Sequence, residues 1–375
     1  SSYSYQWQVS TDSITFNSVT GANANTYSAG TLIANRFYRS IVTSSLGCGS
    51  DTTNIIKIEV YAPFVAASIG TSDSTCFGFA ADTVKTISLP TGGNRTYSYQ
   101  WLESTNGTSW SLIAGQTNNF YLPGVLPSSK YYKMISSSGQ SCGSDSSNAV
   151  FKTRLPQLIK PTIDSSQSIC YNTVPGLLTR TAAATGADGV FTYQWQSSSN
   201  GTTYANVSGQ TGATYLPPTL TSSTYYRTIA SSTYGCGSIA SDSVFIEVYP
   251  IIKSGVIGTA QSICYNTTPG TLSFSTNPSG GGSSYSYQWQ VSTNNVSFTS
   301  ISGATSNTYT PGVLIANRFY NLIVTSTYGC GSDTSNSIQI TVYAPFVTAT
   351  IGSSDSTCFG FTADTVSTTV IATGG

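Results

Sequence analysis

Residues 97–103 read Tyr-Ser-Tyr-Gln-Trp-Leu-Glu, and this stretch carries the clearest secondary-structure signal of the chain. Its aromatic residues occupy every second position, with Ser98 and Gln100 between them. A period of two places alternate side chains on one face of a β-strand, so the aromatic face is expected to be buried. Asn106-Gly107 follows, which is a strong signal for a tight hairpin turn. The stretch therefore predicts a core strand followed by a hairpin.

The same pattern recurs along the chain at a fixed interval of 94 residues. The Tyr-Gln-Trp triplet places its tryptophan at Trp7, Trp101, Trp195 and Trp289. The cysteines keep this interval in two series, Cys48, Cys142, Cys236, Cys330 and Cys76, Cys170, Cys264, Cys358. A fixed period over the whole chain indicates a tandem array of one small domain.

The period divides the chain into three complete repeats and two partial ones. The complete repeats are 62–155, 156–249 and 250–343, while 1–61 is the back part of a repeat and 344–375 the front part of another. Short strand patterns are separated by Gly, Pro and Asn turns, and no stretch has a convincing helical period. We therefore expect an all-β protein, a tandem array of Ig-like β-sandwich domains.

A longer repeat is superimposed on the short one. Residues 283–375 match residues 1–93 without a gap, so the repeats vary in a cycle of three. The two partial repeats are also nearly complementary. Either the chain is a slice of a continuous fibre, or it is a subunit that completes its neighbour's sandwich with donated strands. The cycle of three favours the continuous fibre.

The composition argues against several classes of protein. Charged residues make up 7% of the chain and the formal net charge is zero, whereas a nucleic-acid-binding protein needs clustered Lys and Arg. The 25 Tyr and 15 Phe residues argue against intrinsic disorder. We find no apolar run that approaches the length of a membrane-spanning helix.

The cysteine pattern indicates disulfides rather than a metal site. The eight cysteines are evenly spaced, no Cys-x-x-Cys motif is present, and the chain has no His. Structural disulfides form in oxidising compartments, so an extracellular location is expected. No acidic residue recurs in every repeat, which argues against calcium at the junctions. We expect no metal and no cofactor.

The pairing of the cysteines has two solutions. Bridges within each repeat are favoured, namely Cys76–Cys142, Cys170–Cys236 and Cys264–Cys330. The alternative is a bridge across a junction, such as Cys76–Cys236, because the first loop of one repeat would face the second hairpin tip of the next. The sequence does not fix the connectivity.

The chain has no recurring set of residues that could catalyse a reaction. It lacks a His for general-base catalysis, a Gly-x-Ser-x-Gly motif and a phosphate-binding loop. We therefore expect no enzyme. The aromatic clusters have two interpretations, the sandwich core or a platform that stacks on sugars, and the core is strongly favoured.

Several motifs support a comparison with a known family. They are Cys-Tyr-Asn-Thr-x-Pro-Gly (170–176 and 264–270), Tyr-Gln-Trp-Gln, Tyr-Tyr-Arg (225–227) and Gly-Cys-Gly-Ser (235–238 and 329–332). This combination resembles the Ig-like and PKD-like repeats of large Bacteroidetes cell-surface adhesins, some of which are implicated in gliding motility. The resemblance implies type IX secretion, attachment to the cell surface and an extended stalk.

Five tripeptides look like the O-glycosylation sequon of secreted Bacteroidetes proteins. They have the form Asp-Ser/Thr followed by Thr or Val, and their acceptors would be Ser74, Thr83, Ser243, Ser356 and Thr365. The alternative is ordinary turn chemistry, in which Asp and Ser side chains cap loops. Both interpretations remain open.

The leading hypothesis is a structural or adhesive extracellular filament of disulfide-containing repeats. Its partners would be neighbouring repeats of the same chain or fibre, and surface glycans or other cells, with no nucleic acid and no membrane-spanning segment. The alternatives are a carbohydrate-binding repeat array, with weak sites multiplied by repetition, and a fibre subunit that polymerises by strand complementation.

Overall fold

The computed structural model describes residues 2–354, 356–362 and 364–375. Every regular element among them is a β-strand, and they contain no helix that could cross a membrane. The chain divides into two compact units, Ser1–Leu158 with Gly186–Asp188, and Ile159–Thr185 with Gly189–Gly375. The prediction of an all-β chain is confirmed.

The first unit contains the complete repeat 62–155, which folds into two sheets. The larger sheet has the order β10-β9-β12-β14-β7, with β13 also paired to β12, and the smaller has the order β11-β8-β6. β7 runs parallel to β14, and the other pairs are antiparallel. This two-sheet arrangement is the Ig-like sandwich that the sequence predicts. The strands are β6 (Ser68–Ile69), β7 (Asp73–Thr75), β8 (Val84–Ser88), β9 (Tyr97–Ser104), β10 (Ser111–Leu112), β11 (Phe120–Tyr121), β12 (Lys130–Ser138), β13 (Ser144–Ser146) and β14 (Val150–Arg154).

Residues 1–61, also in the first unit, form the larger sheet alone. Its order is β2-β1-β3-β4, with β5 paired to β3. Because this segment brings no smaller sheet, Ile58 is 37% exposed, whereas Ile340, three periods later, is 0% exposed. The strands are β1 (Tyr3–Ser10), β2 (Asn17–Ser18), β3 (Arg36–Ser44), β4 (Ser50–Thr52) and β5 (Ile56–Ile58).

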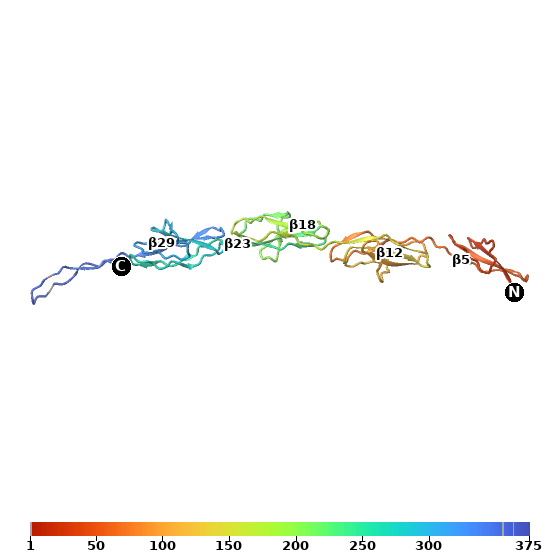
Figure 1. Ribbon diagram of the computed structural model, residues 1–375, viewed down its shortest axis with the longest axis horizontal. Helices are drawn as coiled ribbons and strands as arrows, with labels where there is room; N and C mark the ends of the chain where they lie inside the picture. The colour runs from red at the N-terminus through yellow and green to blue at the C-terminus, as the bar shows by residue number, and fades with distance from the viewer. Residues whose placement is uncertain (1, 355, 363) are drawn as a thin grey trace. The chain divides into compact units, whose positions relative to one another are not determined.

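In the second unit, repeat 156–249 repeats the same topology. Its larger sheet has the order β16-β23-β21-β18-β19, with β22 beside β21, and its smaller sheet the order β15-β17-β20. β18 lies in the part of the chain drawn in green (Figure 1). The strands are β15 (Thr162–Ile163), β16 (Gln167–Cys170), β17 (Leu178–Ala182), β18 (Phe191–Ser198), β19 (Ala205–Asn206), β20 (Thr214–Tyr215), β21 (Thr224–Ser232), β22 (Ser238–Ala240) and β23 (Val244–Tyr249).

Repeat 250–343 has the larger-sheet order β25-β31-β29-β27-β28, with β30 beside β29, and β24 pairs with β26. In the blue segment that follows, the described residues form the strand pair β32-β33 (Figure 1). The strands are β24 (Val256–Ile257), β25 (Gln261–Ile263), β26 (Phe274–Thr276), β27 (Tyr285–Ser292), β28 (Thr299–Ser300), β29 (Arg318–Ser326), β30 (Ser332–Thr334), β31 (Ile338–Val342), β32 (Thr350–Ile351) and β33 (Thr368–Val370).

The tryptophan of each Tyr-Gln-Trp triplet forms the centre of a complete sandwich. Trp101, Trp195 and Trp289 are each 0% exposed. Burial of an indole requires a partner for its N–H, and Trp195 Nε1 donates to the Gly212 carbonyl at 3.1 Å. The prediction that these aromatics form the core is confirmed.

The hairpin after each core strand is fixed by side chains. Ser104 Oγ accepts the backbone N–H groups of Asn106 at 3.2 Å and Gly107 at 2.9 Å. Gly107 has a φ of 76°, and the ring of Tyr131 lies 3.4 Å from where a Cβ would stand. The predicted Asn-Gly turn therefore favours glycine for its positive φ, whereas a Cβ there would make only ordinary contact with the Tyr131 ring.

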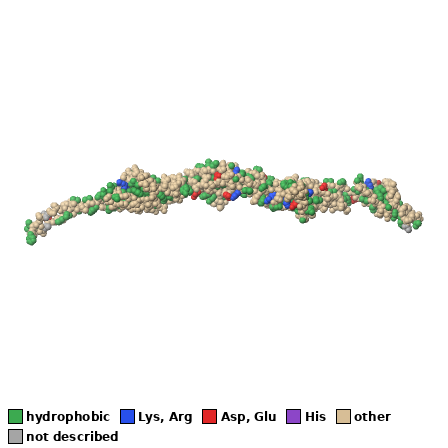
Figure 2. Space-filling model, viewed as in Figure 1, with side chains coloured by type: hydrophobic (Ala, Val, Ile, Leu, Met, Phe, Trp, Pro, Cys, Tyr) green, Lys and Arg blue, Asp and Glu red, His purple; other side chains and the backbone are tan. Residues whose placement is uncertain are grey.

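Charged side chains are sparse on the molecular surface. Figure 2 shows few Lys, Arg, Asp or Glu side chains on its visible face, most of which is uncharged polar or apolar. Two of the ion pairs between described residues are exposed, Lys57 with Glu59 at 3.0 Å and Lys160 with Asp242 at 2.6 Å. Such exposed pairs contribute little to stability, so the cores and backbone ladders hold the repeats together.

Candidate functional site: a disulfide between consecutive repeats

The described residues contain no cluster of three or more His, Cys, Asp or Glu side chains that could hold a metal ion. The most distinctive chemical feature is instead a disulfide in the second unit. It joins Cys170 of repeat 156–249 to Cys330 of repeat 250–343. These two cysteines and the residues around them form the candidate site.

Cys170 ends β16, at the edge of the larger sheet. β16 pairs in parallel with β23, so that Cys170 lies opposite Tyr249, the last residue of the repeat. The backbone N–H of Tyr171 donates to the Tyr249 carbonyl at 3.0 Å. Thr173 Oγ1 donates to the Cys170 carbonyl at 2.7 Å. These bonds hold Cys170 beside the start of the next repeat.

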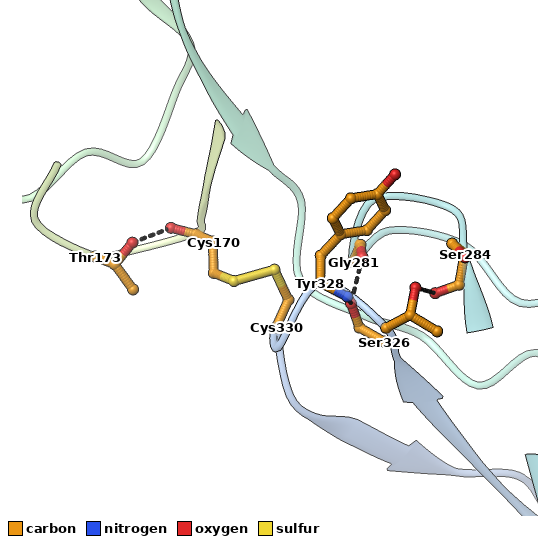
Figure 3. Close-up of a disulfide and its surroundings, with 8 residues drawn as sticks. Cys170, Thr173, Gly281, Ser284, Ser326, Tyr328 and Cys330 are labelled. Atoms are coloured by element: carbon orange, nitrogen blue, oxygen red, sulfur yellow. Dashed lines mark hydrogen bonds between the residues drawn. A yellow bond between two sulfur atoms is a disulfide. The ribbon is translucent and has the colours of Figure 1, made fainter. Parts of the chain in front are cut away.

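Cys330 lies in the turn that joins β29 to β30. The turn closes with the N–H of Ser326 donating to the Gly331 carbonyl at 3.0 Å. The buried Ser326 Oγ accepts the N–H of Tyr328 at 3.2 Å and donates to the Gly281 carbonyl at 2.5 Å. These contacts anchor the turn to the loop that precedes β27 (Figure 3).

The bridge spans a sequence separation of 160 residues, and the two Cα atoms lie 5.2 Å apart (Figure 3). A second contact accompanies it, because the rings of Tyr249 and Tyr328 have centroids 5.1 Å apart. Gly282 makes room for these rings, since a Cβ there would lie 2.5 Å from the Tyr328 ring. The junction is thus held by a covalent bond and by ring packing.

The expected pairing within repeats is wrong for both of these cysteines. Cys170 bonds to Cys330, so the bridges Cys170–Cys236 and Cys264–Cys330 do not form. The physical reason is strand direction. β21 and β23 are antiparallel, so the tip that carries Cys236 lies at the far end of the nine-residue β21, roughly 30 Å from the end where Cys170 lies. The alternative geometry, from the first loop of one repeat to the second hairpin tip of the next, is the one observed.

The remaining cysteines differ in oxidation state. Cys76 and Cys236 are also disulfide-bonded. The free thiols among the described residues are those of Cys48, Cys142, Cys264 and Cys358. The expectation of a Cys76–Cys142 bridge is therefore wrong, as is the assignment of Cys142 and Cys264 to disulfides.

The structure does not favour the sugar-stacking interpretation of the Tyr-Gln-Trp and Tyr-Tyr clusters. In the complete repeats the triplet tryptophans Trp101, Trp195 and Trp289 are fully buried, and one ring of each tyrosine pair is buried as well, for example Tyr226. Burial raises the pKa of the Tyr226 hydroxyl to about 12. Its neighbour Tyr225 lies on the other face, with its ring 4.5 Å from that of Phe245. The triplets therefore do not present a row of exposed aromatic faces.

The candidate glycosylation sites differ in exposure. Ser243, Ser356 and Thr365 are exposed, whereas Ser74 and Thr83 are half-buried. Asp355, which begins the tripeptide around Ser356, lies outside the described residues. Glycosylation of these five hydroxyls stays a prediction.

Comparison with protein-family models identifies the repeats. The model for a domain of unknown function, DUF8696, matches four times, at residues 1–62, 65–153, 159–250 and 253–344. The chain belongs to this family. The matches to DUF8696 follow the 94-residue period, including the partial repeat at the start of the chain. No curated protein sequence matches the chain.

Solved structures with tandem domains are similar to the DUF8696 array at low identity. An I-band fragment of titin, I67–I69, is 14% identical with a TM-score of 0.39, over 75% of this chain and 99% of that one. Three N-terminal domains of the outer capsid protein Hoc of bacteriophage RB49 are 12% identical with a TM-score of 0.34, over 74% and 99%. Sidekick-1 immunoglobulin domains 1–4 are 12% identical with a TM-score of 0.28, over 91% and 90%.

Proposed function

We propose that this DUF8696 array is part of an extracellular stalk with a structural or adhesive role. The observation that carries the proposal is the Cys170–Cys330 bridge, which ties one repeat to the next. A bond at a junction fixes the spacing of consecutive domains, whereas a bond inside a domain only stabilises that domain. Fixed spacing is what a stalk requires.

The oxidation state supports the extracellular part of this proposal. Cys170, Cys330, Cys76 and Cys236 are all disulfide-bonded. Disulfides persist in secreted and surface proteins, whereas cytosolic thiols are kept reduced.

The sequence motifs suggest a more specific role. We place the chain among Bacteroidetes cell-surface adhesins that are exported by type IX secretion, some of which act in gliding motility. Its partners would then be neighbouring repeats, and surface glycans or other cells. The junction motifs Tyr-Gly-Cys-Gly-Ser (328–332) and Cys-Tyr-Asn-Thr (170–173) support this proposal, because they supply the two cysteines of the observed bridge and one of the two tyrosine rings beside it.

The location can be tested on intact cells of the source organism. An antibody raised against the folded chain should label filaments on the outside of cells that have not been permeabilised, and external protease should remove the label. A periplasmic protein of known location serves as the control for membrane integrity. Labelling that appears only after permeabilisation would contradict the proposal.

A further inference from the structure

The Cys170–Cys330 bridge divides its two repeats into residues that bear tension and residues that do not, because the disulfide carries the tension past them. The two cysteines are 160 residues apart in sequence. When the outer ends of repeats 156–249 and 250–343 are pulled apart, the force is transmitted along residues 156–170, through the disulfide and along residues 330–343. The residues between the cysteines form a closed loop beside this path.

The bypassed loop contains most of both sandwiches. It runs from β17 to β29 and includes the buried Trp195 and Trp289, around which the two cores pack. Only β15 and β16 of the first repeat, and β30 and β31 of the second, lie on the covalent path. The cores can therefore open and refold without lengthening the chain.

Without the bridge, the same pull would act on the sandwiches themselves. β16 lies near the start of its repeat and pairs in parallel with β23 at the end, from Gln167 opposite Ile246 to Cys170 opposite Tyr249. Pulling the two ends apart would slide these strands past each other. Resistance would then depend on a few backbone hydrogen bonds, each of which is far weaker than a covalent bond.

We propose that this disulfide is a mechanical bypass that carries tension past the two sandwiches and limits how far this pair of repeats can lengthen. The fully extended path through 156–170 and 330–343 measures roughly 100 Å. Loss of the bridge would release the chain between the two cysteines, which are separated by 160 positions in sequence, and would add roughly 530–580 Å of extended chain. The source of the tension rests on the proposed stalk function, but the bypass itself does not.

The test is single-molecule stretching of the full chain between two internal attachment points. Azide-bearing amino acids at the exposed positions Gln157 and Ala344 leave every thiol untouched and bracket the bridge. The oxidised chain is pulled first, and the same measurement is repeated in a phosphine reductant. The variant Cys170→Ser/Cys330→Ser removes only this bridge and is pulled without reductant.

In the oxidised chain the two attachment points should separate to a distance of no more than roughly 100 Å. Reductant, or the double serine variant, should each add roughly 530–580 Å. The matched control Cys264→Ser removes a free thiol of the same repeat and should leave the oxidised length unchanged. Equal lengths with and without reductant would overturn the bypass. A chain that shows the bypass but proves not to be on the cell surface would overturn only the stalk function.

Discussion

Replacing Ile340 by alanine tests whether the burial of this side chain stabilises the core of repeat 250–343. Ile340 lies in β31 and is 0% exposed, in the cluster with Trp289 and Leu322. Ile58 occupies the equivalent position in residues 1–61 and is 37% exposed, because no second sheet covers it. The same substitution at the two positions should therefore have very different effects.

The magnitude follows from burial. Removing a packed isoleucine side chain costs about 2–5 kcal/mol, since transfer energy and the energy of the cavity add. A cost of about 3 kcal/mol corresponds to roughly 150-fold faster exchange of the backbone amides that open with the sandwich. Ile58→Ala leaves no enclosed cavity, so we expect a cost below about 1 kcal/mol.

Hydrogen exchange measured by mass spectrometry separates the repeats, because each gives its own peptides. Ile340→Ala should accelerate exchange in β27 and β29, while the peptides of repeat 62–155 keep their rates and serve as an internal control. If Ile58→Ala accelerates exchange in β1 and β3 as strongly as Ile340→Ala does in its own repeat, the assignment of these cores is refuted.

Three further predictions follow from particular contacts. Gly280→Ala places a Cβ 2.1 Å from the Ile251 carbonyl oxygen, whereas the control Gly303→Ala, at a similar positive φ, places its Cβ in open space. Urea denaturation should show that Gly280→Ala lowers the free energy of unfolding by about 1 kcal/mol or more beyond the effect of Gly303→Ala. Burial in the folded state raises the pKa of Tyr226 to about 12, so the neutral hydroxyl contributes fully to folding stability below pH about 10, and this contribution is lost as the pH rises towards 12. The urea midpoint of the native chain should therefore fall over this pH range, and Tyr226→Phe should make the fall smaller. Intact mass of native material should exceed the sequence mass by whole glycan units if the five predicted hydroxyls are modified, and an unmodified mass would refute glycosylation.

The fold was predictable because each repeat carries its own local signals. Alternation of aromatic and polar residues around Trp101 gives the strand and its buried face, and Asn106-Gly107 gives the turn. Both signals depend on neighbours a few residues apart. Repetition at 94 residues then tests each interpretation several times within one sequence, which is why the sandwich could be assigned without a structure.

The disulfide connectivity could not be predicted because it depends on which end of the sandwich each loop reaches. Cys170 and Cys236 are 66 residues apart and look like natural partners in the sequence. Only the parallel pairing of β16 with β23 places Cys170 at the end opposite to Cys236. A short parallel pair has no sequence signature of its own, so the signal was absent. The contact between Tyr249 and Tyr328 was missed for the same reason.

Peptide mapping without reduction will show whether consecutive repeats are covalently joined. The native chain is alkylated, digested with trypsin and chymotrypsin, and its cross-linked peptides are identified by mass spectrometry. We predict a cross-link between the peptides that contain Cys170 and Cys330. A cross-link between Cys170 and Cys236 would contradict this prediction, because it would confine each bridge to a single repeat.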